Sequence, residues 1–106
     1  MPKYLIQANY VGEGLKGLLK EGGSSRRATI EKLLGSVGGR VEGFYYAYGD
    51  TDAFVIVDLP DNVTAAALSL TINATAAVTV KVTALLTPEE IDAAAKKTLA
   101  YRPPGQ

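Results

Sequence analysis

The chain has 106 residues, 47% of them hydrophobic, and eleven basic residues balance eleven acidic ones. This length suits one domain with one core, residues 1–106, and small domains gain stability by burying more surface against a partner. A chain without net charge does not attract polyanions, so we expect no nucleic acid among its partners. No stretch approaches the roughly 20 apolar residues of a membrane span, and the N-terminus lacks a signal-peptide core. We therefore expect a soluble, cytoplasmic protein without a membrane partner.

The chain contains no cysteine and no histidine. Their absence excludes the usual zinc sites, histidine-ligated haem, disulfides, and nucleophilic machinery built on a Cys–His pair or a Ser–His–Asp triad. Proton chemistry is left to carboxylates, lysines, arginines and six tyrosines. Asp50, Asp52 and Asp61 could hold a divalent cation, but their spacing matches no calcium loop. We expect neither a metal nor a cofactor.

The first quarter of the chain changes from a strand pattern to a helix pattern. Residues 3–10 alternate, with Tyr4, Ile6, Ala8 and Tyr10 on one side and Leu5, Gln7 and Asn9 on the other, which predicts a strand. Leucines and other aliphatic residues then recur every three or four positions from residue 15 to residue 37 and predict a helix. Two glycines at 22–23 divide it, Ser24 or Ser25 can cap its second piece, and glycines 38–39 end it.

Two further strands are predicted on either side of the polar link "GDTD". Residues 40–49 place Phe44, Tyr46 and Tyr48 on one face, and Val41, Tyr45 and Ala47 on the other. Residues 53–59 form a nearly unbroken apolar run, typical of a strand covered on both faces. The link has the composition of a hairpin turn, and Asp50 and Asp52 suit such a turn.

Asp58 is the carboxylate that fits its predicted element least well, because a central strand does not carry an unpartnered charge. We favour its placement at a frayed strand end beside Pro60; the alternative is a pair with Arg40 or Lys81. Asp61 suits the N-cap of a helix over residues 62–74, where a carboxylate accepts unpaired backbone N–H groups.

The last part of the chain carries clear signals. Residues 77–86 alternate between valines and polar residues that include Lys81, which predicts an edge strand. A helix then begins with Thr87 as cap, Pro88 at the first position and Glu90 closing a capping box, and Asp92 is placed to pair with Lys96. Residues 98–106 contain the end of this helix and a proline-rich tail.

The predicted order is strand, helix, strand, strand, helix, strand, followed by an extra helix. This α+β order is that of the ferredoxin-like fold. The first and third strands carry the least charge and suit the centre of the sheet, and Glu42 and Lys81 suit its edges. Helices would cover one face only, and the other face is too apolar to remain in water. We expect a second copy to cover it, which gives a homodimer or a larger homo-oligomer.

The whole chain resembles the GYD-domain proteins, small bacterial and archaeal proteins of the dimeric α+β barrel class. The resemblance lies in "KGLLKEGGSSRR", "GGRVEGFYYAYGDTDAFVIVDLPDN", "AAALSL" and "LLTPEEIDAAAKKTLAYRPPG". The motif that names the family corresponds here to Gly49, Asp50, Thr51 and Asp52, with Thr51 in place of the tyrosine. The resemblance implies a fold and an assembly mode, but no agreed activity.

Two functions remain for such a chain. The first is a homo-oligomeric module that binds a small molecule or a partner, with Tyr10, Tyr46, Asp50 and Lys81 as candidate ligand-binding residues. The second is a cofactor-independent enzyme, an oxygenase, isomerase or decarboxylase, acting on a small aromatic or lactone-like substrate. Asp52 or Asp50 would then accept the proton, Tyr48 or Tyr10 would donate a hydrogen bond to the oxyanion, and Lys81 would be an electrostatic anchor; of these, Asp52 and Tyr48 are the candidate catalytic residues. Each of these residues also has a structural interpretation: turn formation for the aspartates, packing for the tyrosines and edge protection for Lys81.

Overall fold

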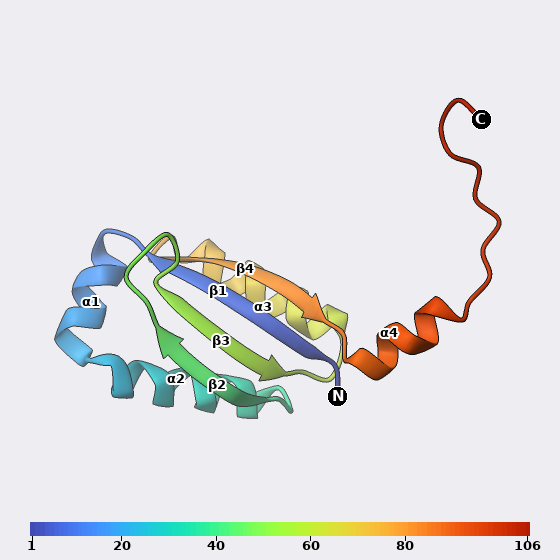
Figure 1. Ribbon diagram of the computed structural model, residues 1–106. Helices are drawn as coiled ribbons and strands as arrows, with labels where there is room; N and C mark the ends of the chain where they lie inside the picture. The colour runs from blue at the N-terminus through green and yellow to red at the C-terminus, as the bar shows by residue number, and fades with distance from the viewer.

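The computed structural model describes residues 1–106 and contains one four-stranded antiparallel sheet with four helices (Figure 1). In chain order the elements are β1 (Lys3–Tyr10), α1 (Glu13–Glu21), α2 (Gly23–Ser36), β2 (Arg40–Tyr46), β3 (Ala53–Asp58), α3 (Asn62–Ala74), β4 (Val78–Leu85) and α4 (Pro88–Ala95). The sheet order is β2-β3-β1-β4. This arrangement confirms the ferredoxin-like α+β prediction with an added C-terminal helix, and it places β1 and β3 at the centre.

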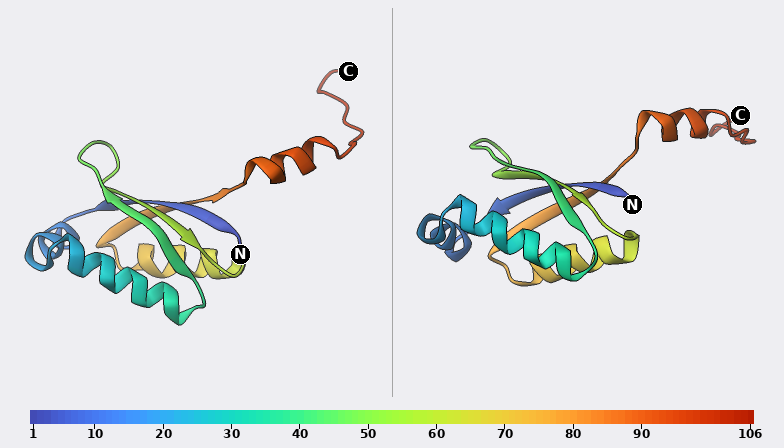
Figure 2. Two further views of the ribbon diagram at one scale, coloured as in Figure 1. Left: turned by 60° about the horizontal axis from the view of Figure 1, so that its bottom comes forward. Right: turned by 90° about the horizontal axis from the view of Figure 1, so that it is seen from below.

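Helices α1, α2 and α3 all lie on one side of the sheet, as the view from below shows (Figure 2). The core fills the space between these helices and the sheet. On β1 every second residue, from Tyr4 to Tyr10, is buried under these helices. Leu34 of α2, Val57 of β3 and Leu59 have no solvent exposure. Burying one such aliphatic side chain stabilises the fold by roughly 1.5–3 kcal/mol, so this layer supplies most of the chain's own stability.

Strand β2 contains a bulge that the sequence pattern does not reveal. Its pairing with β3 shifts between Val41 and Gly43, and Val41 lies opposite the buried Val57 while Phe44 lies opposite the buried Val55. Both side chains therefore pack against the core. The prediction that they lie on opposite faces is wrong, because a bulge adds one residue to a strand and so shifts the alternation.

The helix ends confirm some of the predicted caps and correct others. Asp61 accepts a hydrogen bond from the Thr64 backbone N–H at 2.8 Å, and α4 begins with the full capping box of Thr87 and Glu90. Helix α2 begins at Gly23 and has no side-chain cap, so the serine caps are wrong. Strand β2 ends at Tyr46 and α4 at Ala95, earlier than predicted, and α4 has no ion pair between Asp92 and Lys96.

Helix α1 reaches the sheet through a close backbone contact. The Val11 N–H donates to the Ala77 carbonyl at 3.0 Å. A Cβ atom on Gly14 would lie only 1.9 Å from that same carbonyl oxygen. A Cβ atom on Gly17, in the same helix, would meet nothing within 4 Å. Only a residue without a side chain at position 14 lets α1 approach the link between α3 and β4 this closely.

This contact predicts that the same substitution changes stability in opposite directions at two glycines of one helix, Gly14 and Gly17. We expect Gly14→Ala to destabilise the fold by roughly 1–3 kcal/mol, because the atom it meets is backbone and cannot move away. We expect Gly17→Ala to raise stability by roughly 0.5–1 kcal/mol, since alanine favours helix. Urea unfolding followed by circular dichroism measures both. Equal effects of the two substitutions would contradict the proposed contact.

Candidate functional site

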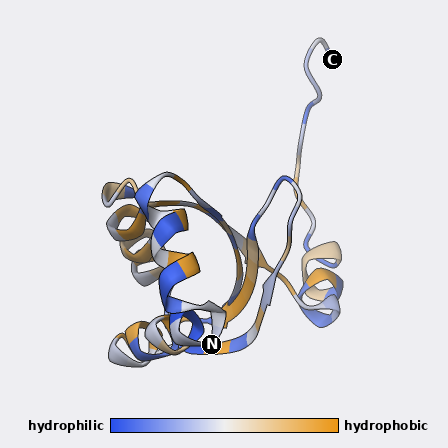
Figure 3. Cartoon of the chain, turned by 90° about the vertical axis from the view of Figure 1, so that its left-hand side faces the viewer, coloured by the Kyte–Doolittle hydropathy of each residue, from blue (hydrophilic) through white to orange (hydrophobic).

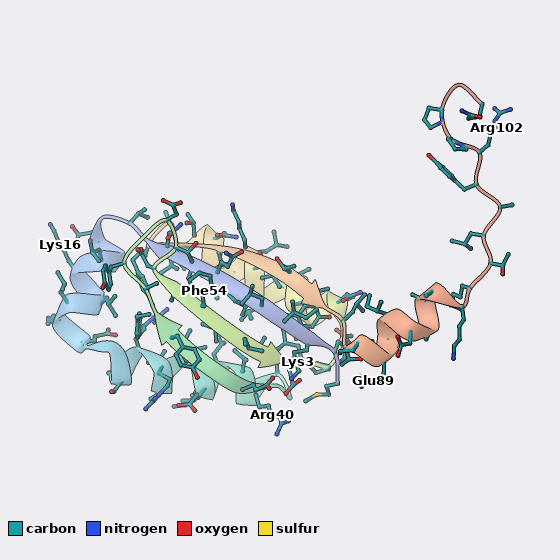
Figure 4. The ribbon with its side chains drawn as sticks, in the orientation of Figure 1. Lys3, Lys16, Arg40, Phe54, Glu89 and Arg102 are labelled. Atoms are coloured by element: carbon teal, nitrogen blue, oxygen red, sulfur yellow. The ribbon has the colours of Figure 1, made fainter.

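The face of the sheet opposite α1, α2 and α3 is open, and it faces the reader in Figure 4. Register places the outward side chains of the four strands on it. Leu5, Phe54 and Ile56 form its apolar centre and remain partly exposed. Around them lie polar residues from β1 and β4: Gln7, Asn9, Thr79, Lys81 and Thr83. The sheet therefore carries apolar side chains on both faces, but its own chain covers only one of them.

A polar hollow of about 290 Å³ lies on this open face. Strand β1, strand β4 and the β2–β3 loop (residues 47–52) line it with Gln7, Asn9, Asp50, Thr51, Thr79, Val80 and Lys81. The hollow brings together Asp50 and Lys81, two of the four residues predicted to bind a ligand. Gln7 and Asn9 were not predicted, although their position on the open side of a central strand was. Together these residues offer one cation, one carboxylate, two amides and two hydroxyl groups.

Asp52 fixes the β2–β3 loop to the end of β1. Its carboxylate accepts a hydrogen bond from the Tyr10 backbone N–H at 2.9 Å. Its own N–H lies 3.0 Å from both the Ala8 carbonyl and the Asn9 side-chain oxygen. These contacts hold the neighbouring Asp50 beside the polar hollow. Asp52 thus has a defined partner in β1, which supports its structural interpretation as a turn residue.

Tyr10 and Tyr46 lie on the helix side of the sheet, away from Asp50 and Lys81. The Tyr46 hydroxyl donates to the Gly23 carbonyl at 3.1 Å. Burial and the neighbouring Tyr10 phenol raise the pKa of Tyr46 to about 12. Tyr10 also lines a cavity of about 30 Å³ between the sheet and helices α2 and α3, room for about two water molecules. The two phenols therefore join the packing between sheet and helices.

Tyr48 and Asp52 border a second, more apolar hollow of about 520 Å³. This α1 hollow lies between α1 and the β2–β3 loop and is lined by Leu15, Leu18, Leu19, Gly22, Gly23, Tyr46, Ala47, Tyr48 and Asp52. The Tyr48 side chain is fully exposed. The structure thus brings the two candidate catalytic residues to one hollow, but to a different one from Asp50 and Lys81.

A charged cluster closes the other end of the open face, where Figure 4 labels Lys3 and Arg40. Asp58 is only 5% exposed. It accepts hydrogen bonds from the Lys3 ammonium and from the Arg40 guanidinium, both at 2.9 Å. Lys3 also pairs with Glu42. Asp58 is the last residue of β3, so its placement at a strand end is right, but this end is not frayed, because a buried carboxylate requires partners. Of the two predicted partners Arg40 is right and Lys81 is wrong, and Lys3 was not predicted.

The two pKa shifts in this cluster follow from these contacts. The hydrogen bond from Lys3 lowers the pKa of Asp58; burial opposes this shift, and the bond from Arg40 adds to it. Hydrogen bonds to Glu42 and Asp58 raise the pKa of Lys3. Both shifts favour the charged forms of Lys3 and Asp58 at neutral pH, and the cluster joins the start of β1 to the start of β2 and the end of β3.

No group of three or more carboxylates in the chain is close enough to hold a metal ion. The three aspartates considered for such a site lie in different places. Asp52 accepts a hydrogen bond from β1, Asp61 accepts one from the first turn of α3, and Asp50 lines the polar hollow. None of the helices is long and apolar enough to cross a membrane.

Comparison with known proteins gives one match. The family model of the GYD domain matches residues 4–95, from β1 to the end of α4. The chain therefore belongs to the GYD-domain family. No curated protein and no solved structure matches it.

The ion pairs of Asp58 make stability depend on pH. A carboxyl whose pKa falls on folding stabilises the fold above its unfolded pKa, and this stabilisation is lost as the pH drops through the folded pKa. We expect Asp58→Asn to cost roughly 1–3 kcal/mol at neutral pH. The difference from the unaltered protein should shrink as the pH falls below about 4. Thermal unfolding across this range measures it, with the exposed Asp92→Asn as control; a pH-independent difference would contradict the ionic contribution.

Proposed function

We propose that this member of the family is a cytoplasmic homodimer that binds a small molecule between the open sheet faces of its two copies. The observation that carries the proposal is the open face itself. It combines an apolar centre of Leu5, Phe54 and Ile56 with the adjoining polar hollow. Neither feature has a covering element in the same chain, and an apolar face rimmed by polar groups is typical of an interaction surface.

The surface area of the chain supports a dimer. It exposes 7501 Å², whereas a compact monomer of 11.1 kDa exposes about 5,700 Å². Stable interfaces bury about 800 Å² on each partner, which is well within this excess, and part of the excess belongs to the exposed residues 86–106. Only 13 of the 106 residues are buried, so much of the apolar surface is uncovered within the chain, which supports burial against a second copy.

The chemistry of the polar hollow limits the class of ligand. Two facing sheets would enclose the hollow next to Phe54 and Leu5, which gives an apolar wall beside a polar end. Lys81 offers a charged donor and Asp50 a charged acceptor, with the Gln7 and Asn9 amides between them. Such a site suits a small molecule with an apolar body and one polar end that both donates and accepts hydrogen bonds. The enzymatic role of Asp52 and Tyr48 stays a prediction.

The dimer is tested by light scattering on the full chain. We expect the unaltered protein to be a dimer and Phe54→Asp to be a monomer, because the new charge would be buried between the sheets without a partner. Leu70→Asp on α3, at a position that is 72% exposed, is the matched control and should remain dimeric. Thr83→Arg on β4 places a charge on the same face without removing an apolar side chain. A monomeric unaltered protein, or a dimer in both open-face variants, would refute the proposal.

The ligand is tested by native mass spectrometry of the freshly purified dimer. We expect extra mass that disappears on denaturation. Lys81→Met should retain this ligand about tenfold less well, the usual effect of removing a charged hydrogen bond. Lys32→Met, on the exposed side of α2, should retain it fully. A ligand-free dimer, or equal retention by both variants, would count against the binding role and leave the dimer intact.

A further inference from the structure

Residues 86–106, here called the C-terminal arm, pack against nothing in their own chain. Every residue of the arm is exposed. Helix α4 projects beyond the end of the sheet, and Figure 3 shows it on the side opposite α1, α2 and α3. The arm lengthens the molecule to 56 Å and raises its radius of gyration to 16.9 Å, compared with about 13 Å for a compact chain of this length.

The sequence nevertheless specifies this helix strongly. Thr87 and Glu90 complete a capping box, and Pro88 occupies the first helical position. A helix of eight residues is not stable alone in water and depends on packing of an apolar side. The arm has such residues: Ile91 is 51% exposed and Leu99 is 82% exposed, and Leu86 and Tyr101 are exposed as well. The surface that stabilises the arm therefore lies outside its own fold.

We propose that the arm packs on a second copy of the chain, in the α1 hollow of that copy. This inference rests on the homodimer proposed above. The arm leaves the sheet where β1 begins, on the side of the open face (Figures 1 and 2). The α1 hollow lies at the opposite end of the sheet, where β1 ends, and its Leu19 is 78% exposed. Each chain thus carries an unpacked arm with exposed apolar side chains at one end and an unfilled apolar hollow at the other.

The symmetry of a face-to-face dimer brings these two features together. Two open faces in contact are related by a two-fold axis that lies between the sheets. An axis that crosses the strands places the start of β1 in one copy over the α1 end of the other, and α4 is already on that side of the sheet. An axis along the strands would put both arms at one end, away from both hollows. The crossing arrangement fills both hollows at once, because a two-fold contact is reciprocal.

The absence of native cysteines makes a direct cross-linking test possible. One copy carries Ile91→Cys, a second, differently tagged copy carries Leu19→Cys, and a short bifunctional maleimide joins thiols that lie close together. We expect a covalent heterodimer. Val63→Cys, on an equally exposed position of α3, replaces Leu19→Cys in the control and should give none. A dimer without the Leu19 cross-link would overturn the arm proposal and leave the proposed function standing.

A second pair of variants measures the contribution of the arm. Ile91 and Ala93 lie on roughly opposite sides of α4, so Ile91→Asp and Ala93→Asp introduce the same residue on different faces. We expect Ile91→Asp to raise the dimer dissociation constant at least about tenfold, and Ala93→Asp to change it less than about threefold. Equal dissociation constants would overturn the proposal. So would an intrachain cross-link between Ile91→Cys and Thr83→Cys, which would show that the arm covers its own sheet. A monomeric unaltered chain would refute both proposals.

Discussion

The handedness of the two crossover connections decides which face of this sheet is covered. Strands β1 and β2 are parallel to each other with β3 between them, and β3 and β4 are parallel with β1 between them. Connections between parallel strands of one sheet are right-handed in nearly all proteins. The two connections run in opposite directions across the sheet, so right-handedness places α1, α2 and α3 on the same side. The central strands also carry Leu5, Phe54 and Ile56 on the uncovered face, and the exposed apolar centre of the open face is a direct result of this constraint.

Polar contacts at the two ends of the sheet hold this one-sided layer in register. At one end the buried Asp58 joins Lys3 of β1 to Arg40 of β2. At the other end the Asp52 carboxylate joins the β2–β3 loop to the last residue of β1. Lys3 and Arg40 are far from Asp58 in the sequence. Their ion pairs with Asp58 therefore form only when β1, β2 and β3 are paired correctly. Asp58 is buried whereas Arg40 is largely exposed, so removing both Lys3 and Arg40 would leave a buried carboxylate without a partner, which is costlier than losing the whole cluster.

The sequence was sufficient for the elements whose signals are local. Alternation on β1 and β4, the Asp61 cap of α3 and the capping box of α4 each depend on residues within a few positions, and the structure confirms them. Features that depend on tertiary pairing were predicted only in part: the central place of β1 and β3 and the contact of Arg40 with Asp58 were predicted, and two others were not. The bulge at Val41 has no signature in a single strand, and the pairing of Asp58 with Lys3 joins residues 55 positions apart.

The residues of the candidate site also fall into two groups, those that the sequence identifies and those that depend on strand pairing. Asp50 and Lys81 were identified by residue type and do lie in one hollow. Gln7 and Asn9 complete it because β1 lies next to β4, which residue type alone does not indicate. Tyr46, by contrast, belongs to the packing between sheet and helices, since its hydroxyl donates to the carbonyl of Gly23, the first residue of α2.

The β2–β3 loop borders both the polar hollow and the α1 hollow. Asp50 and Thr51 line the polar hollow, and Tyr48 and Asp52 line the α1 hollow. Because residues 48–52 belong to one short loop, a change in the position of this loop would alter the shape of both hollows. If a ligand in the polar hollow and an occupant of the α1 hollow favoured different loop positions, each would change the other's affinity by the same factor. One short loop would thus let the assembly of the dimer report whether its ligand is bound.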